Sequence, residues 1–95
     1  TSEYLKYMGN ARIRAEVMNS PNIAAQASGA ITLGDVAWVR RRKPDVDSMG
    51  PFDRRQVMRA SLILADGERI PWLKNVLRNY NSVVDRAVVR WLLAQ

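Results

Sequence analysis

The sequence predicts an all-α fold, a compact bundle of five or six short helices. Apolar residues recur at spacings of three and four along most of the chain, which is the pattern of helices with one buried face. Residues that begin and end helices, chiefly Ser, Thr, Asp, Gly and Pro, stand between these stretches. Hydrophobic residues make up 47% and charged residues 25% of the chain, which are ordinary values for a globular domain.

The 95 residues are interpreted as a single helical domain that covers 1–95. A chain of this length buries a modest hydrophobic core without disulfides. It begins at Thr1 rather than at Met, so we expect a domain excised from, or processed out of, a longer chain.

The N-terminal third of the chain predicts two helices. The first covers roughly residues 3–18, and its apolar face consists of Tyr4, Met8, Ala11, Ala15 and Met18. The second runs from Pro21 to Ser28, with Gly29 as its C-terminal stop.

A third helix is predicted from about Leu33 to Lys43. Thr32 and Asp35 have the spacing of a capping box before it, and Pro44 ends it, because the residue before a proline is pushed out of the helical region. We expect the inward positions to be Leu33, Val36 and Ala37, and we expect Trp38 to lie in the core.

A fourth helix is predicted from Arg54 to Ala65, after a loop over residues 45–51 and with Asp53 as its N-cap. An alternative interpretation makes 62–72 a local β-hairpin that turns at Asp66-Gly67. We favour the helix, because Pro71 disfavours a regular second strand. The inward positions of this helix are expected to be Val57, Ala60, Ser61 and Leu64.

The C-terminal residues predict two more helices. One is opened by Pro71, and its inward residues are Leu73, Val76, Leu77 and Tyr80. The last runs from Val83 to Leu93, and Ser82 and Asp85 form a second capping-box pattern before it. Its expected inward face consists of Val84, Ala87, Val88, Trp91 and Leu92.

The chain contains no cysteine and no histidine, which removes thiolate nucleophiles, the commonest general base and the commonest transition-metal ligands. Asp45 and Asp47 are interpreted as local charge balance rather than as a magnesium site. Gly29 and Gly34 have the spacing of a phosphate loop, but Asp35-Val36 replaces its Lys-Ser/Thr. We therefore expect no enzyme, no metal and no cofactor.

Positive charge is concentrated in one run, Arg40-Arg41-Arg42-Lys43, which we call the basic cluster. Its position at the end of a helix gives a rigid group of cations, and arginine grips phosphate oxygens with two donors at once. Because the net charge is +6, polyanions are the favoured partners. The leading hypothesis is a non-catalytic domain that binds the phosphate backbone of DNA or RNA with weak sequence specificity. Three further arginines are predicted to extend the surface: Arg54, Arg55 and Arg59.

The segment from Ile23 to Arg42 resembles a helix-turn-helix in part. Its second helix, however, carries the cations at the C-terminal end, whereas recognition helices read bases from their N-terminal part. This disagreement favours a phosphate clamp over a base-reading helix.

The alternative hypothesis is a protein-interaction or assembly module, in which the cations meet an acidic protein or another copy of the chain. Apolar residues beyond the needs of a small core favour it. A membrane surface is the least expected partner, and we expect an intracellular location, in the cytoplasm or nucleoid. The surplus apolar residues are Met58, Leu62, Ile63, Val89 and Leu93.

Overall fold

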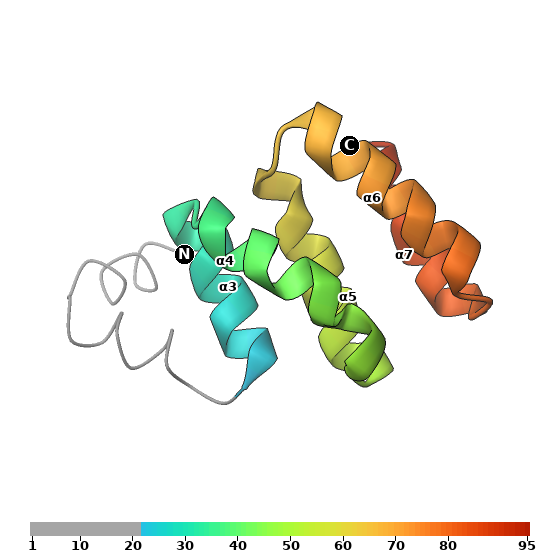
Figure 1. Cartoon of the computed structure of the whole chain (residues 1–95), viewed down its shortest axis with the longest axis horizontal. Coiled ribbons are helices and arrows are strands. Elements are labelled where there is room, and N and C mark those ends of the chain that lie inside the picture. The colour runs from blue at the N-terminus through green and yellow to red at the C-terminus, as the bar shows by residue number, and fades with distance from the viewer. Residues whose placement is uncertain (1–21) are drawn as a thin grey trace.

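The computed structural model describes residues 22–95, which form helices and no strand (Figure 1). The α-helices are α3 (Ile23–Leu33), α4 (Val36–Arg42), α5 (Pro51–Ala60), α6 (Asp66–Asn79) and α7 (Val83–Leu93), and the 3-10 helices are η1 (Lys43–Ser48) and η2 (Ser61–Ile63). The predicted all-α fold is therefore confirmed. The predicted helix over residues 3–18 lies outside the described residues. None of the helices within 22–95 has the length and apolarity that crossing a membrane requires.

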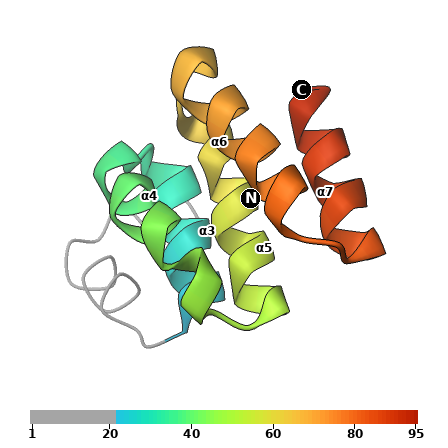
Figure 2. The ribbon, with the colours of Figure 1, turned by 45° about the vertical axis from the view of Figure 1, so that its right-hand side comes forward.

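Helix α5 is the central element of this part of the chain (Figures 1 and 2). It packs against α3 on one side and against α7 on the other, and it also contacts η1. Helices α6 and α7 lie side by side and form the other end of the molecule from α3 and α4.

Residues 22–95 form two core clusters, and half-buried Trp72 packs against both. Trp38 is buried in the first cluster, as predicted, and its indole Nε1 donates to Gln26 Oε1 over 3.0 Å. The first cluster consists of Ala27, Ala30, Trp38, Val39, Val46, Val57, Ala60 and Leu64. The second consists of Met58, Leu73, Val76, Val89 and Leu92.

The predicted end of the second helix at Gly29 is wrong. Helix α3 continues through Gly29, which is buried, and ends at Gly34, whose φ of 66° is the left-handed conformation that glycine adopts without strain. The packing of α3 against α5 therefore outweighs the low helix propensity of Gly29.

The predicted capping box at residues 32–35 is also wrong. Asp35 is itself the N-cap of α4, and its side chain accepts from Trp38 N over 3.1 Å. Thr32 belongs to α3, where its hydroxyl donates to the carbonyl oxygen of Ser28. As a result α4 begins later than predicted, and Leu33 and Ala37 are exposed rather than inward.

The fourth and fifth helices, in contrast, begin earlier than predicted. Helix α5 begins at Pro51 with Gly50 as its N-cap, so Asp53 lies within its first turn. Helix α6 begins at Asp66, and Pro71 lies inside it, which leaves the Gly67 carbonyl without a helical donor. The hairpin alternative over 62–72 is wrong, because η2 and the start of α6 occupy that stretch. The predicted inward set of the fourth helix is buried throughout: Val57, Ala60, Ser61 and Leu64.

Helix α7 has the predicted bounds, and Leu92 is buried as predicted, but the buried face is rotated about the helix axis relative to the predicted one. Ser82 caps it as predicted, accepting from Asp85 N over 3.4 Å. Its buried residues, however, are Asp85, Val89 and Leu92, and the orientation follows from the ion pairs that Asp85 forms with α5. The predicted inward positions Val84, Ala87 and Trp91 are exposed. Met58 and Val89 are core residues rather than surplus apolar surface.

Candidate functional site

The basic cluster lies where α4 ends and η1 begins, and the first turn of α6 supplies a carboxylate to it. The guanidinium of Arg40 binds Glu68 with two donors, Nε to Oε2 over 2.9 Å and Nη2 to Oε1 over 2.9 Å. The ammonium of Lys43 lies 3.3 Å from Glu68 Oε2. Two members of the cluster thus share one anion, although the Arg40 side chain stays 60% exposed.

These contacts keep Glu68 ionised. The hydrogen bond from Arg40 lowers the pKa of Glu68 from 4.5 to about 2, and Lys43 adds to this, against the opposing effect of desolvation. The same hydrogen bond raises the pKa of Arg40. Glu68 therefore fixes the direction of the Arg40 side chain and removes part of the charge of the cluster at every pH near neutrality.

The two middle members of the cluster differ in their surroundings. Arg42 Nη2 donates to Gln26 Oε1 over 3.2 Å, and its Nη1 lies 3.8 Å from Asp45 Oδ2. Arg41 is exposed and forms no hydrogen bond or ion pair within residues 22–95. Arg41 is accordingly the member of the cluster whose charge is fully available to a partner.

The structure does not bring Arg54 and Arg55 to the basic cluster. Both bind Asp85 of α7 over 2.7 Å, and Arg54 is buried with its guanidinium carbon 4.1 Å from the centre of the Tyr80 ring. Burial opposes the ionisation of Asp85, but the hydrogen bonds and charges of the two arginines outweigh it and lower the pKa of Asp85. Arg59 is exposed and donates to the hydroxyl of Ser28 over 3.2 Å.

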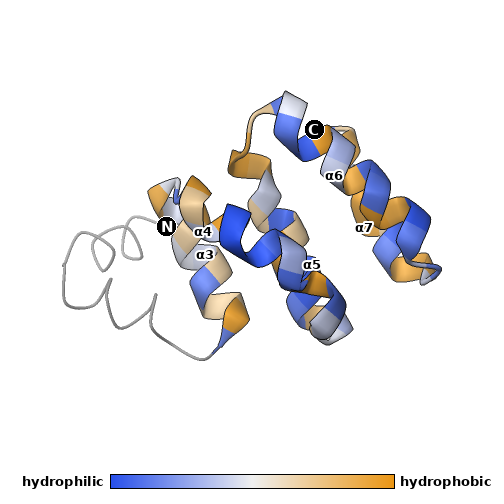
Figure 3. Ribbon diagram, viewed as in Figure 1, coloured by the Kyte–Doolittle hydropathy of each residue, from blue (hydrophilic) through white to orange (hydrophobic). Residues whose placement is uncertain are grey.

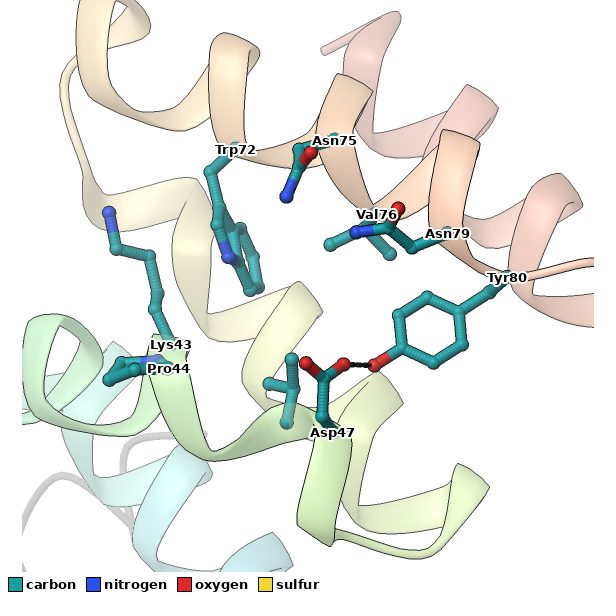
Figure 4. Close-up of a pocket in the computed structure, with 9 residues that line it drawn as sticks. Lys43, Pro44, Asp47, Trp72, Asn75, Val76, Asn79 and Tyr80 are labelled. Carbon is teal, nitrogen blue, oxygen red and sulfur yellow. Dashed lines mark hydrogen bonds between the residues drawn. The ribbon is translucent and has the colours of Figure 1, made fainter.

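A pocket of about 340 Å³ lies next to the basic cluster, between η1 and α6 (Figure 4). Lys43 belongs to both, and its ammonium lies 5.9 Å from the centre of the Trp72 ring. At the other end of the pocket the Tyr80 hydroxyl donates to Asp47. The remaining lining residues are Pro44, Val46, Asn75, Val76 and Asn79.

The pocket combines aromatic walls with amide groups. Asn75 and Asn79 are one turn apart on α6, and Asn79 has no hydrogen-bond partner within the described part of the chain. Of the charged lining residues, Lys43 is paired with Glu68 and Asp47 accepts from Tyr80. Sequence reasoning missed this pocket, since its walls come from segments far apart in the chain. Trp72, Asn75 and Asn79 at helical spacing were the available signal.

Of the two carboxylates predicted to balance local charge, Asp45 lies beside a cation of the described part of the chain and Asp47 does not. Asp45 lies beside Arg42, and Asp47 accepts from Tyr80. Within residues 22–95, no group of three or more His, Cys, Asp or Glu side chains has the arrangement of a metal site.

Compared with protein families, with curated proteins and with solved structures, the chain shows no significant match.

Proposed function

We propose that this domain binds nucleic acid through phosphate contacts at the end of α4. The observation that carries the proposal is the exposure of Arg40 and Arg41 at a rigid helix end, where Arg41 has no partner within residues 22–95. A helix end fixes the backbone of these residues, so little backbone freedom is lost on binding. Glu68 accepts from the Nε and Nη2 of Arg40, and the Nη1 of Arg40 remains to donate to a phosphate.

An excess of positive charge among the predicted contact residues supports the same proposal. Three carboxylates, Glu68, Asp45 and Asp85, lie against five of the seven predicted cations, so positive charge remains in excess. Arg59 is the exposed cation of α5 that would extend the surface, whereas Arg54 and Arg55 serve to hold α7. Contacts of this kind position a protein on a phosphate backbone without reading bases, so weak sequence specificity follows.

The test is a retardation titration with duplex DNA and with RNA at two salt concentrations. Arg40→Ala/Arg41→Ala removes two contacts, and the slope of log affinity against log salt should fall in magnitude by about 2 on duplex DNA. Affinity should fall by a similar factor for unrelated sequences, because the lost contacts are to phosphate.

The matched control is Lys74→Ala/Arg90→Ala, which removes the same charge from exposed positions on α6 and α7. It should change the slope less than the α4 variant does. Equal slopes in the two double variants would place the contacts elsewhere, and no retardation of either nucleic acid by the unaltered protein at low salt would refute the proposal.

A protein-interaction role is the second candidate function, and a specific observation favours it: three large apolar side chains of α7 are more than half exposed, namely Val83, Val84 and Trp91. Self-association loses part of its support, because Met58 and Val89, counted among the surplus apolar residues, are buried.

A further inference from the structure

The outward face of α7 carries four exposed apolar side chains, Val83, Val84, Ala87 and Trp91, which we call the α7 strip. Val83 is 82%, Val84 52% and Trp91 57% exposed. The spacings of three and four from Val84 to Ala87 and on to Trp91 place these side chains along one side of the helix. None of them is part of, or packed against, the core cluster on the opposite side of α7.

The position of α7 explains why the strip is uncovered. Figure 2 shows α7 at one edge of the molecule, with α5 and α6 on its inner side. Figure 3 shows hydrophobic residues along the α7 ribbon. A surface helix normally turns its wider apolar face inward, yet α7 buries a carboxylate, Asp85, and leaves Trp91 outside. A contiguous exposed patch of this kind marks an interaction site.

The charged residues of α7 and of α6 after Pro71, apart from Asp85, are all positive. From Pro71 to Gln95 the sequence has one acidic residue, Asp85, which is 1% exposed and already bound to Arg54 and Arg55. The cations of this stretch form no ion pair within the described part of the chain. They are Lys74 and Arg78 on α6 and Arg86 and Arg90 on α7.

This charge pattern indicates which kind of partner binds the α7 strip. A second copy of the chain would bring two such cationic surfaces together, and like charges across an interface oppose association. A partner with apolar residues on one side and carboxylates beside them would satisfy both the strip and its cations. We propose that the α7 strip docks an acidic amphipathic helix of a partner protein.

The dimensions of the strip fit a helix. Val83 and Trp91 are separated by about 12 Å along the axis, at ~1.5 Å per residue, which corresponds to roughly two turns. Ala87 lies between the bulkier Val83, Val84 and Trp91, so the strip has a low point into which one side chain of a packed helix fits. A partner helix would therefore use apolar residues at positions i, i+3, i+4 and i+7. This site is at the opposite end of the described molecule from α4 and goes beyond nucleic-acid binding (Figure 1).

The probe is a synthetic helical peptide of about 15 residues with Leu at i, i+3, i+4 and i+7 and Glu at the flanking positions. A matched peptide carries Lys in place of Glu, and a second has the composition of the first in scrambled order. Calorimetry measures affinity, and amide chemical shifts of the full chain locate the site. The Glu peptide should bind about tenfold or more tightly than the Lys peptide, because α7 and the adjacent α6 carry four cations that form no ion pair within the described part of the chain. Its shift changes should map to Val83, Val84, Ala87 and Trp91.

Two variants test the strip and its cations separately. Ala87→Glu places a charge in the middle of the strip at an exposed position and should abolish binding of the Glu peptide. Phe52→Glu, at the similarly exposed Phe52 on α5 (63% exposed), is the control and should bind normally. Arg86→Glu/Arg90→Glu leaves the strip intact and should reverse the preference, so that the Lys peptide binds more tightly. Circular dichroism verifies that each variant is folded.

Several results would overturn the proposal. These are equal binding of the Glu and Lys peptides, binding that survives Ala87→Glu, and shift changes that lie away from α7. A concentration-dependent dimer that Ala87→Glu dissociates, without peptide binding, would make a second copy the occupant. Binding of phosphatidylserine vesicles or of a single-stranded oligonucleotide at α7, again without peptide binding, would assign the strip to a membrane or to nucleic acid.

Discussion

Asp85 is the buried carboxylate through which α5 and α7 are joined. It accepts from Arg54 and from Arg55, each over 2.7 Å, and its exposed fraction is 1%. The Nε of Arg54 has no hydrogen-bond partner among residues 22–95, so this buried guanidinium depends on Asp85 and on the Tyr80 ring. From the sequence, Asp85 was expected to complete a capping box, and the role it has instead could not be foreseen, because its partners lie about thirty residues earlier.

Asp85→Ala should lower the free energy of unfolding by about 3 kcal/mol, because the change leaves the charge of Arg54 buried without its anion. Urea unfolding at pH 7 measures this. Asp53→Ala is the control: Asp53 lies in the first turn of α5 with no ion pair within residues 22–95, so its loss should cost less than about 1 kcal/mol. Similar urea midpoints of unfolding for the two variants would contradict the role assigned to Asp85.

At the scale of single elements, the end of α3 shows how a correct rule was applied to the wrong residue. Glycine does end this helix, but the glycine is Gly34 rather than Gly29. Gly29 is buried inside α3, and only the tertiary contacts of that helix reveal it as a packing position. The starts of α5 and α6 also differ from the prediction: α5 begins three residues before Arg54, and α6 begins five residues before Pro71.

Gly34→Ala should destabilise the protein by about 1 kcal/mol, because an alanine at a φ of 66° is strained even though no atom lies near its added Cβ. Gly67→Ala is the matched control, since Gly67 lies inside α6 and its added Cβ also meets no atom. This second change should stabilise the protein by roughly 0.5 kcal/mol, because alanine is the better helix former. Thermal unfolding distinguishes the two, and shifts of the same sign would contradict the left-handed conformation at Gly34.

At the scale of the whole molecule, two carboxylates join elements that are distant in sequence. Glu68 of α6 holds the end of α4 and the start of η1, and Asp85 of α7 holds α5. Both carboxyls have a pKa below the ordinary value in the folded protein. The tertiary arrangement of α4, α5, α6 and α7 is therefore linked to proton binding by these two groups.

Stability should be independent of pH between about 5 and 8, because the chain has no histidine, and should decrease on acidification. The unfolded chain binds protons near the ordinary pKa values, 4.5 for Glu68 and 3.8 for Asp85, before the folded chain does. The contribution of Glu68 to the free energy of unfolding is thus complete above about pH 4.5 and is lost as the pH falls toward 2. Urea midpoints measured from pH 8 to pH 2 test this. Glu68→Gln/Asp85→Asn should show a shallower acid limb, and an unchanged limb would mean that other groups govern acid unfolding.

The candidate site was predictable only in part, because some of its contacts depend on the tertiary arrangement of the helices. A run of four cations before a proline is visible in the sequence, and Trp38 was assigned correctly to the core beside it. The sequence did not indicate that Glu68 binds Arg40 and Lys43, that Arg54 is buried, or that Lys43 lines a pocket with Trp72. Each of these depends on how α4 and α6, or α5 and α7, are placed relative to one another.

Sequence alone determined the helical class, the burial of Val57 and Ala60 in α5, the bounds of α7 and the location of the basic cluster, because local periodicity and end-capping residues encode these features. Tertiary structure decided which face of α7 is buried. Its apolar periodicity predicts that Val84, Ala87 and Trp91 point inward, but the two ion pairs of Asp85 turn the face with Asp85, Val89 and Leu92 toward α5. A helix with apolar residues on more than one side has no single inward face in its own sequence, and the charged partners on a neighbouring helix make the choice.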